Sequence, residues 1–185
     1  MRKPSVEDII EFSNYNAAWP AMATAEIAVL KENSKDLADV ILHIEHIGST
    51  AIPGMKAKPI IDLYVGVRSI VDAQPLISII EKMGYQYWAE NPNPNKMFFV
   101  KGMPPLGAGR THHIHVVHYD SDYFKARVAF RDFLIRYPNY AREYENLKIT
   151  LAAKDNRDRE AYTDAKGEFI TKILRLAAFK GDTSR

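Results

Sequence analysis

The chain has 185 residues, 46% of them apolar and 26% charged, which is the composition of an ordinary soluble globular protein with one well-buried core. The net charge of +2 gives no general case for nucleic acid as a partner, because that would need a strongly basic face. The chain has no cysteine, which excludes disulfides and thiolate metal sites and fits a reducing, cytoplasmic location.

The sequence gives no sign of a membrane protein. Acidic residues stand among the apolar ones at positions 7, 8 and 11, so the N-terminus does not read as a signal peptide. No apolar run approaches the roughly 20 residues that span a bilayer. Repeats and linker-like boundaries are also absent from the sequence, so we expect a single domain over residues 1–185.

The first half of the chain alternates between helix and strand patterns. The predicted elements are a helix starting at Ser5, a helix over 22–30, a strand over 40–47, a loop over 48–58 and a strand over 59–67. Met22, Ile27 and Leu30 indicate the inward side of the second helix. The strand over 59–67 is mostly apolar, as expected for a central strand covered on both faces.

The second half of the chain becomes increasingly helical. The predicted elements are a helix over 72–83 with Asp72 as cap and Gly84 as stop, hairpin strands over 85–89 and 96–101, a loop over 104–109, a strand over 111–118, and helices from Ser121 onward with breaks near Pro138 and Asn156. The predicted fold class is therefore α/β (α+β), with a mixed sheet flanked by helices and a helical C-terminal third.

A small-residue turn, Gly48-Ser49-Thr50, follows the first predicted strand. Such a turn brings backbone N–H groups and two hydroxyls close to a phosphate, so these three residues are candidate phosphate ligands. The alternative is a simple turn, because Gly-Ser pairs are common.

Asp62 lies within an otherwise apolar strand, where a lone buried carboxylate is costly unless it is paired, protonated or bound to a metal. We predict a catalytic or metal-binding role for it, holding a divalent ion against a phosphate. The alternative is a structural ion pair with Lys58, four residues earlier.

Four histidines crowd one predicted strand at positions 112, 113, 115 and 118. Because side chains alternate along a strand, His113 and His115 share one face and His112 and His118 the other. Two imidazoles at this spacing suit a transition metal, so His113 and His115 are candidate metal ligands and His115 a candidate catalytic residue. The alternatives are contact with a ligand anion and ordinary hydrogen bonding within the strand.

Several further residues are candidate ligand contacts. His46 and Glu45 face opposite sides of their strand, so only one of them can point to the Gly-Ser turn. Lys58 and Arg110 lie in predicted loops, where either could neutralise a phosphate or simply be solvated.

Two Tyr-x-x-x-Lys pairs occur in the C-terminal third, Tyr144 with Lys148 and Tyr162 with Lys166. At this spacing each pair shares one helical face. The lysines could bind the phosphates of a nucleotide while a tyrosine ring stacks on its base. The alternative is a helix surface with buried tyrosine rings and lysines that extend to solvent.

The string HIGSTAIPGMKAKPIIDL, residues 46–63, resembles the GrpB family, a branch of the nucleotidyltransferase superfamily. The resemblance covers nearly the whole chain. It also includes Tyr15 with Trp19-Pro20, the HHIHVV strand, Ala129-Phe130-Arg131-Asp132, Tyr144 with Leu147-Lys148, and Tyr162 with Lys166. It favours His46 over Glu45 at the Gly-Ser turn.

The resemblance implies a nucleotidyltransferase-like fold, in which a hydrophobic-Gly-Ser turn precedes a strand with two acidic residues one position apart. Here Tyr64 stands where the second carboxylate would be, which puts ordinary two-metal transfer in doubt. In the superfamily a neighbouring strand often supplies a third carboxylate, and His113-Ile114-His115 would take that place. Related domains are fused to dephospho-coenzyme A kinase in some bacteria.

These patterns lead to three hypotheses. The first is a domain that binds a nucleotide or other phosphate-bearing small molecule and, if active, transfers a nucleotidyl or phosphoryl group. The second is a non-catalytic nucleotide-binding or assisting module linked to coenzyme A biosynthesis, which could have a protein partner. The third is a small metallohydrolase using Asp62, His113 and His115. The expected cofactor is a divalent metal, Zn²⁺, Mn²⁺ or Mg²⁺.

Overall fold

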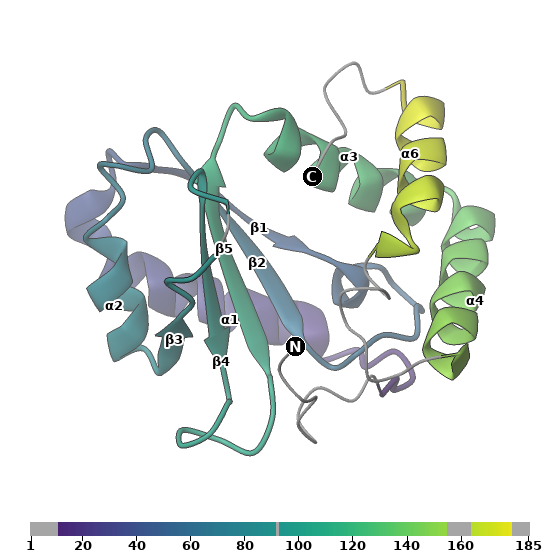
Figure 1. Cartoon of the computed structure of the whole chain (residues 1–185), viewed down its shortest axis with the longest axis horizontal. Coiled ribbons are helices and arrows are strands. Elements are labelled where there is room, and N and C mark those ends of the chain that lie inside the picture. Colours follow the sequence, from purple (N-terminus) through teal and green to yellow (C-terminus); the bar gives the residue numbers. More distant parts are fainter. Residues whose placement is uncertain (1–10, 92, 155–163, 179–185) are drawn as a thin grey trace.

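The computed structural model describes residues 11–91, 93–154 and 164–178. They form a five-stranded sheet with the spatial order β1-β2-β5-β4-β3 (Figure 1). The strands are β1 (Ile41–Ile47), β2 (Ile61–Val67), β3 (Tyr85–Tyr87), β4 (Lys96–Lys101) and β5 (His112–His118). The β2–β5 pair is parallel, and the other three neighbouring pairs are antiparallel. The predicted mixed sheet is therefore confirmed.

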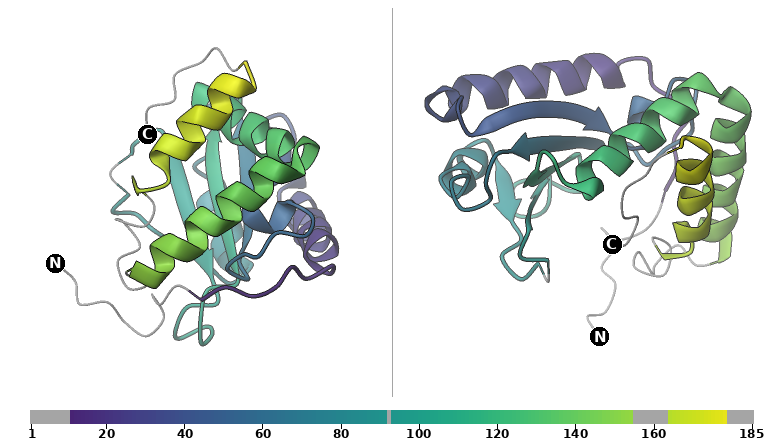
Figure 2. Two further views of the ribbon diagram at one scale, coloured as in Figure 1. Left: turned by 90° about the vertical axis from the view of Figure 1, so that its right-hand side faces the viewer. Right: turned by 90° about the horizontal axis from the view of Figure 1, so that it is seen from above.

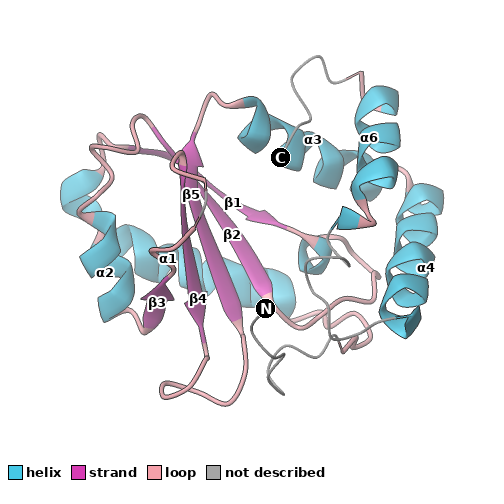
Figure 3. Cartoon of the chain, viewed as in Figure 1, coloured by secondary structure: helices cyan, strands magenta, loops and turns pink. Residues whose placement is uncertain are grey.

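Helices flank this sheet and make up the C-terminal third of the described chain (Figure 3). The α-helices are α1 (Trp19–Asn33), α2 (Leu76–Lys82), α3 (Asp122–Arg136), α4 (Pro138–Lys154) and α6 (Gly167–Leu176), with short 3₁₀ turns η2 (Lys35–Leu37) and η3 (Ser49–Ala51). In the described part of the chain, no helix is long and apolar enough to cross a membrane.

One face of the sheet is dry and carries the main core. α1 lies along this face, and α3 lies on the opposite side of the sheet (Figure 2). Leu63 and Val65 of β2 are fully buried there, as is Ile114 of β5. They pack with residues such as Leu30 of α1 and Leu76 of α2. This burial is the main source of stability, at about 25 cal/mol per Å² of apolar surface.

The opposite face of the sheet is partly polar, because the alternate residues of β2 and β5 point there. Asp62 and Tyr64 of β2 lie beside His113 and His115 of β5 on this side. α3 covers part of this face, and α4 and α6 pack with α3 beyond the β1 edge (Figures 1 and 2). Their apolar side chains form a second cluster of buried residues. The polar face is thus bounded by the helical C-terminal third.

Most predicted elements have the expected type, with differences at their ends. Asp72 was predicted to cap the helix over 72–83, but α2 begins at Leu76. Successive turns occupy residues 70–75 instead, and the backbone N–H of Asp72 donates to the Ser69 hydroxyl. Gly84 adopts φ 87° just after α2, as its role as the stop requires. The predicted helix start at Ser5 and the break near Asn156 lie outside the described residues.

Candidate functional site

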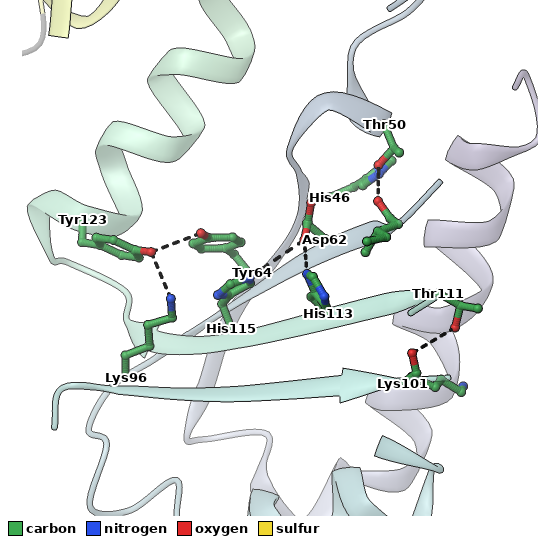
Figure 4. A network of polar contacts seen from close by, with 11 residues as sticks. His46, Thr50, Asp62, Tyr64, Lys96, Lys101, Thr111, His113, His115 and Tyr123 are labelled. Carbon is green, nitrogen blue, oxygen red and sulfur yellow. Dashed lines mark hydrogen bonds and ion pairs between the residues drawn. The ribbon is translucent and has the colours of Figure 1, made fainter. Parts of the chain in front are cut away.

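The parallel pairing of β2 and β5 brings three predicted site residues together. Asp62 is in register with His113, and Tyr64 with His115. Side chains in register on neighbouring strands share a face, so the carboxylate lies beside both imidazoles. Figure 4 shows Asp62 above the two rings. The predicted shared face of His113 and His115 is confirmed.

The carboxylate of Asp62 is the centre of this group. Its Oδ1 lies 2.9 Å from Nδ1 of His113 and 3.9 Å from Nε2 of His115. One ligand atom from each of the three residues can be chosen so that all lie within 4.8 Å of one another. The Asp62 side chain is 29% exposed, so the group is half-buried rather than sealed. These residues are close enough to hold a metal ion, and below we call them the Asp-His-His triad.

The charges of the triad favour cation binding. Burial alone would raise the pKa of Asp62, but hydrogen bonding and attraction from His113 and His115 hold it well below its usual range. Burial lowers the pKa of His115 to about 3, against the opposing attraction of Asp62. At neutral pH the triad therefore offers an ionised carboxylate and, at His115, a neutral imidazole, which are the forms that bind a metal.

The two imidazoles also leave ring nitrogens unused. Nε2 of His113 and Nδ1 of His115 are buried and have no hydrogen-bond partner among the described residues. A buried polar atom without a partner is costly, and a bound ligand or water is the usual explanation. In both rings, however, the nitrogen nearest to Asp62 is the other one, Nδ1 of His113 and Nε2 of His115, so the case for a metal rests on those two atoms. One carboxylate and two imidazoles form a donor set that suits Zn²⁺ or Mn²⁺ better than Mg²⁺. The residues present therefore fit a divalent transition metal.

The Gly-Ser turn lies directly against the triad. Gly48 has φ 85°, a conformation that favours glycine. A Cβ added at Gly48 would come within 2.5 Å of Oδ2 of Asp62, so no side chain fits between the turn and the carboxylate. Glycine is needed here both for its backbone conformation and for close approach. The predicted neighbourhood of the turn and Asp62 is thus present in the structure.

Lys148 joins the Gly-Ser turn from α4. Its Nζ donates to Oγ of Ser49 at 2.9 Å and to the carbonyl oxygen of Lys56 at 2.9 Å. The residue is 2% exposed, and its ammonium also lies 5.2 Å from the ring centre of Tyr144. The predicted common face of Tyr144 and Lys148 is therefore present, and the lysine points inward rather than to solvent.

The ammonium of Lys148 is held in an unfavourable environment. Burial and, to a smaller extent, the positive charge of Lys166 together lower the pKa of Lys148 to about 7, against the opposing effect of Glu145. Lys166, another predicted phosphate ligand, is therefore near enough to Lys148 for their charges to interact.

Two residues that were predicted to contact a ligand, Thr50 and His46, make hydrogen bonds within the protein. Thr50 is 1% exposed and donates its hydroxyl proton to the carbonyl oxygen of Ile60. The Thr50 oxygen then accepts from Nε2 of His46, at 3.0 Å. Burial lowers the pKa of His46 to about 4, so the ring is neutral and carries its proton on Nε2. His46 does point to the turn, as predicted, but it braces Thr50 there rather than facing a ligand.

The prediction that Tyr144 stacks on a substrate does not fit its place in the structure. Tyr144 is 7% exposed and packs against Phe130 and Phe169, with ring centres 5.1 and 5.3 Å away. Its ring belongs to the second core cluster, because the heptad-like face of α4 turns inward toward α3 and α6. Tyr162, its predicted counterpart, lies outside the described residues.

The two loop cations lie near the start of the neighbouring strands β2 and β5. Lys58 precedes β2, and Arg110 precedes β5. The starts of the two strands are joined by a hydrogen bond from the N–H of Ile61 to the carbonyl oxygen of Thr111. Both side chains are half-buried. Their roles as phosphate ligands stay predictions.

Sequence reasoning did not assign a second polar group on the same face of the sheet. Tyr64 stacks on His115, with ring centres 4.4 Å apart, and its hydroxyl lies 3.3 Å from that of Tyr123. Lys96 donates to the Tyr123 hydroxyl at 3.2 Å, and Arg127 lies over the same ring (Figure 4 shows all but Arg127). The sequence signal for this group was the alternation along β4, which puts Lys96 and Phe98 on one face of that strand.

Comparison with known proteins places the chain among relatives over most of its length. A family model described as GrpB protein matches residues 9–176. A UPF0157 protein of Pseudomonas aeruginosa is 46% identical over 169 residues, covering 91% of this chain and 67% of the relative. The crystal structure of conserved protein GrpB from Enterococcus faecalis has a TM-score of 0.78 at 34% identity, covering 90% of this chain and 96% of that one.

A more distant match is to a larger enzyme. The dephospho-CoA kinase of Mycolicibacterium paratuberculosis is 28% identical over 182 residues, which covers 86% of this chain and 44% of the kinase. The chain is therefore similar to about half of that protein.

Proposed function

The chain belongs to the GrpB family, whose model spans residues 9–176, and from this premise we propose that it binds a nucleotide or similar phosphate-bearing small molecule together with a divalent metal. The observation that carries the proposal is one junction. Gly48 lies so close to Asp62 of the Asp-His-His triad that an added Cβ would collide with its carboxylate, while the hydroxyl oxygen of the adjacent Ser49 accepts a hydrogen bond from the Lys148 ammonium. A cation site and a site for anions thus lie side by side, as a metal-bound phosphate requires.

The proposed roles follow from the chemistry of each group. Asp62, His113 and His115 would hold the metal, which when bound would neutralise charge on phosphate oxygens. Ser49 and Lys148 would bind the phosphates, with Lys166 adding a second positive charge. The hydrogen bond between Ser49 and Lys148 holds both groups in place before the ligand arrives, which lowers the entropy lost on binding.

The proposed function is ligand binding, and catalytic turnover is not part of it. Turnover would be a nucleotidyl or phosphoryl transfer, but two-metal transfer needs a second carboxylate, and Tyr64 stands in its place. Tyr64 is 6% exposed and its hydroxyl is engaged with Tyr123, so it does not substitute as a metal ligand. The cluster of phosphate-type residues beside the triad also favours nucleotide binding over the alternative of a small metallohydrolase.

A second candidate function is favoured by the match to dephospho-CoA kinase. In this alternative the domain binds nucleotide without chemistry and assists a partner in coenzyme A biosynthesis. Both candidates require the same binding site. They differ in whether a bound nucleotide is turned over, so measuring product formation separates them.

The experiment that tests the proposal is a calorimetric titration of ATP, GTP and dephospho-coenzyme A, with and without Mn²⁺. We expect at least one of them to bind more tightly with Mn²⁺, and Asp62→Asn to remove that metal dependence. His118→Ala is the matched control, because His118 lies on the same strand and is exposed. Equal affinities with and without metal, or no binding by any of the three, would contradict the proposal.

A further inference from the structure

Two cations gather around one tyrosine on the polar face of the sheet, beyond the ring of Tyr64. Lys96, at the start of β4, donates to the Tyr123 hydroxyl at 3.2 Å and lies 5.3 Å from the ring centre. Arg127, which lies one helical turn after Tyr123 on α3, is 4.9 Å from the same ring centre. All three side chains are half-buried, and they come from a strand and a helix that are not neighbours in sequence.

Within the described part of the chain, neither cation has a carboxylate partner. Among the described residues, no Asp or Glu oxygen lies within 4.0 Å of Lys96 or Arg127. Comparable cations elsewhere in the chain are paired, Arg131 with Glu45 at 2.6 Å and Lys101 with Glu26 at 2.8 Å. A half-buried pair of positive charges without a counter-ion is costly, and a bound anion is the ordinary way to compensate it.

The electrostatics of Tyr123 agree with an excess of positive charge. Burial alone would raise the pKa of Tyr123, but Arg127 and Lys96, with the hydrogen bonds from Tyr64 and Lys96, lower it to about 8. Within this cluster, the phenol of Tyr123 is thus the group that most readily becomes an anion. Its hydroxyl is also a hydrogen-bond donor for an external anion when protonated.

We propose that Lys96, Arg127 and the Tyr123 hydroxyl form a second phosphate-binding site, suited to the dianion of a phosphomonoester. Two cations match the charge of nearly −2 that such a group carries at neutral pH. The forked guanidinium and the phenol add directional donors for its oxygens. The site is separate from Ser49 and Lys148, and the Tyr64 ring lies between it and the triad, 4.4 Å from His115 and 6.1 Å from Tyr123.

This site goes beyond the proposed nucleotide binding and does not depend on it. It is tested with inorganic phosphate in the presence of a metal chelator, at constant ionic strength, in a Lys148→Met background that removes the first phosphate site. The readout is the shift of the Arg127 side-chain N–H signal in NMR during titration. We expect a saturable shift in this background.

Matched variants locate the binding. Adding Lys96→Met removes a cation and should weaken phosphate binding about ten- to a hundredfold. Adding Tyr123→Phe removes only the phenol hydroxyl and should weaken binding less. Lys96→Arg should restore it by returning the charge, and Lys82→Met, an exposed lysine on α2, should have no effect. Circular dichroism verifies that each variant is folded. If Lys148→Met alone abolishes the response, or Lys96→Met does not weaken it, the second site is wrong.

A second arm separates a free phosphate ion from a phosphate carried by a metabolite. Glycerol phosphate and inorganic phosphate are titrated in parallel under the same conditions. The proposal predicts comparable or tighter binding of the monoester, because only its phosphate group enters the cluster. Binding of inorganic phosphate alone, with no response to the monoester, would overturn the assignment to phosphomonoesters.

Discussion

Nδ1 of His113 lies 2.9 Å from Oδ1 of Asp62, across the parallel pair β2 and β5. Each residue sits at the second position of its strand, so the contact is fixed by strand register rather than by a flexible loop. The same register places Tyr64 beside His115, two residues further along each strand. The triad is therefore positioned by two neighbouring strands in the interior of the sheet, which suits a metal site.

Metal binding should stabilise the folded protein. Zn²⁺ or Mn²⁺ at a hundred times its dissociation constant should add about 2.7 kcal/mol of stability, because it binds only the native state. Thermal unfolding with and without metal measures this gain. Asp62→Asn and His115→Ala should lose it while staying folded, whereas His118→Ala, on the opposite face of the same strand, should keep it. An equal metal response in all four proteins would rule out the triad as ligands.

Replacing Gly48 should disturb the triad as well as the turn. Gly48→Ala forces a non-glycine residue into a positive φ, which costs about 1–3 kcal/mol, and its Cβ would collide with Asp62. Gly54→Ala is the matched control, since Gly54 has φ 78° and its Cβ would meet nothing within 4 Å. Urea unfolding should show the larger loss for Gly48→Ala. Only that variant should also lose the metal-dependent gain in melting temperature.

Lys148 should make nucleotide binding depend on pH. With its pKa lowered to about 7, the free protein loses this ammonium charge as pH rises through neutrality, so affinity for phosphates should fall between about pH 6 and 9. Lys148→Met should bind about ten- to a hundredfold more weakly at pH 6 and should flatten this pH dependence. Lys82→Met should behave like wild type. Titration calorimetry at several pH values would contradict the assignment if wild type and Lys148→Met had parallel profiles.

Lys148 should also shape the pH dependence of stability. The folded-state pKa lies below the ordinary value of 10.5, so the unfolded chain binds the proton more tightly between about pH 7 and 10.5. Folding stability should therefore rise across this window relative to the Lys148→Met variant, and the two curves should run parallel below pH 7. Urea unfolding at several pH values measures the difference. A constant difference across the window would show that the lysine is not buried.

Tyr123 should ionise at a lower pH than an ordinary tyrosine. Its pKa of about 8 depends on Arg127, Lys96 and the Tyr64 hydroxyl, which face it from α3, β4 and β2. Spectrophotometric titration of wild type should show one early phenolate transition, and Tyr123→Phe should remove it. Lys96→Met should move it to higher pH, because a cation that stabilises the phenolate is lost. An unchanged early transition in Tyr123→Phe would assign it to another residue.

Much of the site was predictable because its parts are local. Alternation along a strand correctly placed His113 and His115 on one face, and the apolar surroundings of Asp62 marked it as a carboxylate that needs a partner. The partner proved to be the histidine pair rather than a residue nearby in sequence. The Gly-Ser turn was recognisable from its small residues and its resemblance to the family.

Other features depend on pairings that local patterns do not encode. Lys148 meets Ser49 across 99 residues, and Tyr64 meets Tyr123 across 59. Helical spacing put Tyr144 and Lys148 on one face but did not say that this face packs against Phe130 and Phe169. The start of α2 was misplaced because Asp72 has the chemistry of a cap, whereas a series of turns stabilised by Ser69 precedes the helix.

The most direct test of the account is a crystal structure with Mn²⁺ and a non-hydrolysable ATP analogue. The account predicts an anomalous manganese peak with Asp62, His113 and His115 as ligands. It also predicts phosphate oxygens within hydrogen-bond distance of Ser49 and Lys148. Manganese bound elsewhere, or a nucleotide whose phosphates do not reach the Gly-Ser turn, would contradict it.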